Sequence, residues 1–79
     1  SNDITLTFDT DADEDQTIAA QIKAVSAADV VTLAITDSSG AGSETMTFSE
    51  AIGGSTAATT IDTITIAAGA VTTFSSTVH

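Results

Sequence analysis

The residues with the clearest chemical potential are aspartates at alternate positions near the start of the chain: Asp9, Asp11, Asp13 and Asp15. Alternate carboxylates in one loop can direct several oxygen atoms at a hard cation such as Ca²⁺. The run departs from the calcium loop of an EF-hand, because Glu14 stands where that loop needs glycine and Ala20 where it needs a bidentate glutamate. Two interpretations follow: a looser calcium site at these four aspartates, or a solvated acidic loop that caps the next element.

Threonine pairs of the form T-x-T are a second candidate surface, and they occur at Thr5/Thr7, Thr45/Thr47 and Thr63/Thr65. Regular T-x-T arrays on a flat sheet resemble the ice-binding surfaces of some antifreeze proteins, and ice binding is therefore a minor alternative. Successive pairs lie 40 and 18 residues apart, whereas a solenoid would show a fixed period. We therefore predict no repeat architecture, and threonine is in any case favoured on exposed strand faces.

The chain lacks the residues that common active sites use. Cysteine, arginine, tryptophan and tyrosine are absent, and the single histidine is the terminal residue, His79. A preorganised active site is hard to build at a chain end. Without His79, a Ser–His triad would have no base. Gly53 and Gly54 are not followed by the lysine of a phosphate-binding loop. We predict that the protein is not an enzyme and binds no cofactor, apart from the calcium of the first interpretation.

Charge restricts the partners. Eleven acidic residues and one lysine, Lys23, give 79 residues a formal net charge of −10. Phosphate contacts need lysine and arginine, so nucleic acid and anionic membranes are not expected partners. A chain of this length without disulfides forms a marginal core, and neighbouring protein commonly stabilises such a domain. We therefore expect a homo-oligomer or a larger protein lattice.

The apolar residues alternate in short runs, which is typical of strands that are buried on one face. The expected strands are residues 4–8, 30–36, 44–48, 61–66 and 71–78, and the second and third should pair as an antiparallel hairpin. These elements predict a mainly β fold, a small antiparallel β-sandwich or barrel of about five short strands. Residues 1–79 should form one small acidic domain with mobile termini.

One segment favours a helix. Ile18, Ile22 and Val25 share one helical face, and the acidic residues before them suit the first turn of a helix. We expect a short helix over about residues 15–25, with a further strand as the alternative because Ile18, Ala20 and Ile22 also alternate. The predicted core is Ile4, Leu6, Phe8, Ile18, Ile22, Val31, Leu33, Ile35, Met46, Phe48, Ile64, Ile66, Val71 and Phe74.

Two structural roles fit this composition. The first is a small virion component of the capsid decoration or cement kind, which acts through self-association and binding to a lattice. The second is a bacterial cell-surface module, as part of an adhesin, an S-layer or an extracellular fibre, with calcium as a stabiliser. The span from Ser1 to His79 resembles a complete small gene product and favours the virion role. The expected location is accordingly the virion or the cell surface.

Overall fold

The computed structural model describes residues 3–10, 14–38 and 44–79, and within them the regular structure consists of six short strands. Among these residues there is no helix, and hence none that could span a membrane. The strands are β1 (Asp3–Asp9), β2 (Gln16–Ile18), β3 (Val30–Thr36), β4 (Thr45–Phe48), β5 (Thr63–Ile66) and β6 (Val71–Phe74).

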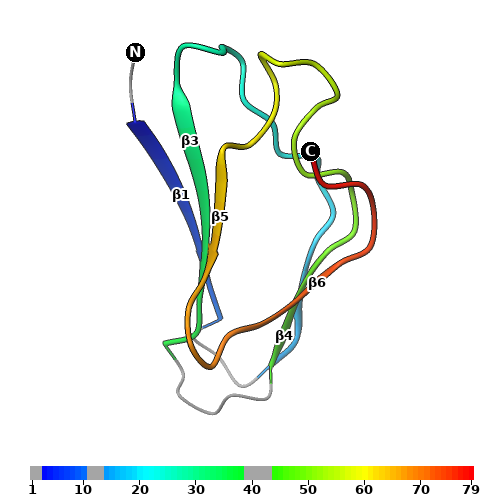
Figure 1. Cartoon of the computed structure of the whole chain (residues 1–79). Coiled ribbons are helices and arrows are strands. Elements are labelled where there is room, and N and C mark those ends of the chain that lie inside the picture. The colour runs from blue at the N-terminus through cyan, green and yellow to red at the C-terminus, as the bar shows by residue number, and fades with distance from the viewer. Residues whose placement is uncertain (1–2, 11–13, 39–43) are drawn as a thin grey trace.

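Successive strands alternate between two sheets that face each other (Figure 1). The first sheet has the order β1-β3-β5 and the second the order β2-β4-β6, and every pairing is parallel. Ile22, Ile52 and Val78 form a third parallel ladder of single bridges. Each of the two sheets and the bridge ladder thus contains one segment from each of three successive turns of the chain. The fold is therefore three stacked coils of a β-solenoid.

The predicted antiparallel sandwich or barrel is wrong, and so is the predicted hairpin. Residues 30–36 and 44–48 do form consecutive strands, but the chain carries them into different sheets. Period-two alternation reports only that one strand face is buried, and here both parallel sheets have one exposed face. The pattern therefore located strands without distinguishing a reversal of the chain from a turn into the opposite sheet.

The helix expected over residues 15–25 is also wrong. Residues 16–18 form strand β2, and Ile22 makes a β-bridge to Ile52. Ile18 and Ile22 pack on the core from this extended segment, whereas Val25 is 87% exposed. The helical spacing was misleading because Ile18 and Ile22 also lie an even number of residues apart, which fits one side of an extended segment equally well.

The solenoid escapes a search for a fixed period because its coils differ in length. Paired residues are 27 apart between β1 and β3, as in Asp3 and Val30, but 31 apart between β3 and β5, as in Thr32 and Thr63. In the second sheet the separations are 30 between β2 and β4 and 26 between β4 and β6. The loops absorb these differences while the strands stay aligned.

The core lies between the two sheets and is centred on the middle coil. Phe48, at 0% exposure, contacts the Phe8 ring edge-on at 5.3 Å and stacks on the Phe74 ring at 5.4 Å. Five predicted core residues are buried, namely Val31, Leu33, Ile35, Met46 and Phe48. Phe8, Ile18, Ile22, Ile64 and Phe74 are partly buried against them. Buried apolar side chains that the prediction missed are Ala24, Ile52 and Ile61.

Candidate functional site

The acidic segment lies where the chain turns from the first sheet into the second. Asp9 ends β1, and its carboxylate accepts hydrogen bonds from the Ser38 hydroxyl at 2.7 Å and the Ser38 backbone N–H at 2.9 Å. These two bonds hold the pKa of Asp9 below its ordinary value. Asp9 therefore ties the end of the first coil to the corresponding turn of the second.

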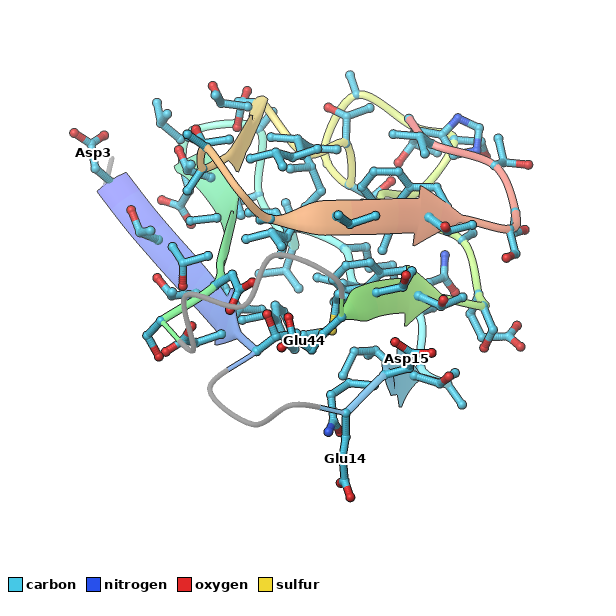
Figure 2. All side chains as sticks on the ribbon, turned by 90° about the horizontal axis from the view of Figure 1, so that it is seen from below. Asp3, Glu14, Asp15 and Glu44 are labelled. Carbon is cyan, nitrogen blue, oxygen red and sulfur yellow. The ribbon has the colours of Figure 1, made fainter. Side chains whose placement is uncertain are left out.

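Asp15 makes the matching contact at the start of the second sheet. Its Oδ1 accepts a hydrogen bond of 2.9 Å from the backbone N–H of Thr45, the first residue of β4. Figure 2 shows Glu14 pointing away from the sheets, and Glu44 lying close to the end of β1 and the start of β4. Glu44 is only 3% exposed. Carboxylates thus link neighbouring coils at this turn.

The predicted calcium site is only partly described. Asp11 and Asp13 lie outside the described residues, and Asp9 and Asp15 each bind backbone of the next coil. Within the described part of the chain, no three His, Cys, Asp or Glu side chains are grouped as a metal site would require. The calcium site at Asp9, Asp11, Asp13 and Asp15 therefore stays a prediction, and the described contacts give two of these residues a structural role.

The threonine pairs form columns that the sequence spacing concealed. On the outer face of the first sheet, the parallel register aligns one column of three threonines and a second column of two threonines with an alanine between them. The first column is Thr5, Thr32 and Thr63, and the second is Thr7, Ala34 and Thr65. Strands in a sheet lie about 4.8 Å apart, and alternate residues of one strand are about 6.6 Å apart. The face thus carries a regular array of threonine side chains.

Thr45 and Thr47 do not belong to that face. They lie in β4 of the second sheet, where Thr17, Thr47 and Thr73 form a separate column. The interval of 40 residues between the first two T-x-T pairs therefore separates residues of different sheets and does not measure the length of a coil. Counting from Thr5 to Thr32 and then to Thr63 follows the coils and would have revealed the column.

The two ends of the solenoid expose apolar residues that the middle coil buries. Leu6 in β1 is 43% exposed, although its register partner Leu33 is 1% exposed. Ile66 in β5 is 47% exposed, and its partner Ile35 is 1% exposed. Exposure near 45% also applies to Ile4 and Val78, whose partners Val31 and Ile52 are buried. Four predicted core residues are exposed. Ile4, Leu6 and Ile66 lie at inward positions of end coils, whereas Val71 pairs with Thr45 and lies on the outer face of the second sheet.

Both ends also present an unpaired strand edge. β1 and β5 are the edge strands of the first sheet, and β2 and β6 those of the second. Such edges carry backbone N–H and C=O groups that can bind a further strand. No pocket is formed by the residues described, so the molecule's candidate surfaces are the open ends and the threonine face. Comparison of the chain with protein-family models, with curated proteins and with solved structures finds no match.

Proposed function

We propose that this chain is a non-enzymatic structural module, a short stretch of β-solenoid that further coils continue at both ends. The observation that supports this proposal is the burial contrast between the middle coil and the end coils. Leu33 and Ile35 are each 1% exposed because a coil lies on both sides of them. Leu6 and Ile66 occupy the same inward positions but have a coil on one side only.

Free-standing solenoids end in capping repeats with a polar outer face. Here Leu6 and Ile66 remain more than 40% open at the two ends, and no element among the described residues covers them. Each added coil would remove apolar surface from water, at about 25 cal/mol per Å². The end coils therefore have the character of internal repeats, which are stable when a neighbouring coil lies on each side.

This architecture favours an extended fibre or cell-surface protein over a capsid decoration protein. A contact between one end of a molecule and the opposite end of its neighbour is heterologous, and it propagates unless a rotation closes it. A discrete oligomer that decorates a lattice needs, by contrast, contacts that close into a finite assembly. The acidic surface, with a net charge of −10, suits neither nucleic acid nor anionic membrane as the partner.

A tandem chain tests the proposal. Two copies of residues 1–79 joined in one polypeptide should unfold in urea at a higher midpoint than the single chain, since the junction buries one end of each copy. Leu6→Asp in the second copy, at the junction, should remove most of this gain. The same substitution in the first copy, at the free end, is the matched control and should have a smaller effect. Equal effects at both positions would contradict the proposal.

Ice binding is a second candidate, which the threonine columns of the first sheet support. A face of aligned threonine side chains can order water in a lattice-like pattern, and five of the six column positions on this face are threonine. We expect measurable thermal hysteresis that Thr32→Lys abolishes, because lysine would project from the centre of the face. Thr47→Lys, at the middle of the other sheet, is the control and should retain it. Hysteresis that survives Thr32→Lys would exclude this face.

A further inference from the structure

We propose that the coil covering each end is supplied by a second copy of this chain, with the first coil of one copy stacked in parallel on the third coil of the next. The inference rests on the proposed function, because it names the partner at the open ends. In this arrangement β1 of the second copy extends the sheet at β5, and its β2 extends the other sheet at β6. Both edges are open in the molecule as described.

The register of this contact follows from the ladders already present. Leu6 pairs with Leu33, and Leu33 pairs with Ile64. One more step of the same ladder places Leu6 of the second copy on Ile64, and Phe8 of the second copy on Ile66. Large apolar residues thus meet at these two inward positions of the first sheet, as they do inside the molecule.

The second sheet continues in the same way. Ile18 pairs with Phe48 and Phe48 pairs with Phe74, so Ile18 of the second copy falls on Phe74. Apolar contact is therefore available across both sheets at once. A contact through one sheet alone would leave the opposite sheet open at the junction.

A buried hydroxyl fits this contact too. Thr72 Oγ1 is shielded from solvent, and no described group hydrogen-bonds to it. Thr72 pairs with Met46, which pairs with Gln16, so the next ladder step brings Gln16 of a second copy opposite Thr72. A glutamine amide can both donate to and accept from a hydroxyl. The second copy thus offers a partner to Thr72 once its hydroxyl turns toward the open edge of β6.

The charged residues of the edge strands do not oppose one another in this register. Asp3 pairs with Val30 and Asp9 with Thr36. One ladder step further, these aspartates of the second copy would lie against Ile61 and Ala67. Asp62 would lie against Ile4, and its carboxylate already accepts a 2.8 Å hydrogen bond from the Val31 backbone N–H. Repulsion therefore comes from the net charge of −10 on each copy and not from facing pairs, and salt should relieve it.

The edge strands also lack two of the residues that commonly prevent strand addition. Natural edge strands are commonly protected by proline, lysine or a covering element. The chain contains no proline, and its one lysine, Lys23, is outside the four edge strands. The aspartates at the two ends of β1 are the only charges in those strands. Because one end of each copy meets the opposite end of the next, the contact is heterologous and predicts open filaments.

The experiment uses two single-end variants of the whole chain, Leu6→Asp and Ile66→Asp. The unsubstituted protein should show a mean mass in sedimentation that rises above one chain with concentration, and more steeply at 0.15 M salt (a Debye length of about 8 Å) than at 0.01 M (about 30 Å). Each variant alone should remain a monomer, because one end of every contact is blocked. Their equimolar mixture should form dimers and nothing larger, because each supplies the end that the other lacks.

Controls separate this contact from a general effect of added charge and from misfolding. Thr47→Asp adds the same charge to the exposed face of the middle coil and should associate like the unsubstituted protein. Circular dichroism of each variant identifies any that fails to fold, in which case Leu6→Ser and Ile66→Ser repeat the mixing experiment with a smaller change. Dimers of either variant alone would overturn the head-to-tail contact. A monomeric protein under all conditions would overturn self-association, while the tandem chain would still report whether a covering coil stabilises the ends.

Discussion

Phe48→Ala should lower the free energy of unfolding by about 3–5 kcal/mol, the range for phenylalanine truncation in a core. Phe48 is 0% exposed and lies in the middle coil, between Phe8 at 5.3 Å and Phe74 at 5.4 Å. Its removal leaves a cavity that touches all three coils, since each ring belongs to a different one. For a small domain whose total stability is about 5 kcal/mol, this loss would leave much of the protein unfolded.

Urea denaturation followed by circular dichroism measures this loss, since the chain has no tryptophan or tyrosine for fluorescence. Val25→Ala is the matched control: Val25 is apolar but 87% exposed, so the change should stay within about 0.5 kcal/mol. Phe74→Ala should cost less than Phe48→Ala, because Phe74 lies in an end coil and is only partly buried. A loss below about 1 kcal/mol for Phe48→Ala would mean that the three rings do not form the centre of the core.

The strands were predictable from sequence to a greater extent than their arrangement. Alternation placed β1, β3 and β4 within about a residue of their bounds, and it identified Leu33, Ile35 and Phe48 as buried. The direction of pairing was not encoded in that pattern, because parallel and antiparallel strands with one buried face alternate alike. Coils of unequal length then removed the fixed period that would have disclosed the parallel stacking.

In the candidate site, too, the residues were predictable from sequence but their partners were not. The acidic residues were found by composition, but Asp9 and Asp15 act on Ser38 and Thr45, about 30 residues away. No local pattern reports a partner at that distance until the register of the coils is known. The apolar residues of the ends were predicted as core for the same reason. The side chains of Ile4, Leu6 and Ile66 do point inward, and only their place in the stack, at the ends, leaves them exposed.

Gly53→Ala should be the second most damaging single change. Gly53 has a φ of 75°, where any residue with a Cβ is strained at about 1–3 kcal/mol. Its added Cβ would also meet the backbone carbonyl group of His79. That residue donates to the Ile52 carbonyl oxygen at 2.8 Å and accepts from the Ile61 N–H at 3.2 Å. The methyl group would push the end of the chain from this position, so we expect a loss near the upper end of that range.

Gly69→Ala is the control that separates backbone strain from the contact with His79. Gly69 also has a positive φ, of 90°, but an added Cβ there meets nothing within 4 Å. Its substitution should therefore cost only the backbone strain, toward the lower end of the range of about 1–3 kcal/mol. Deleting His79 should then recover part of the stability of the Gly53→Ala variant, because the obstructing carbonyl is gone. If both glycine substitutions cost the same in urea denaturation, the docking of His79 beside Gly53 contributes nothing to the fold.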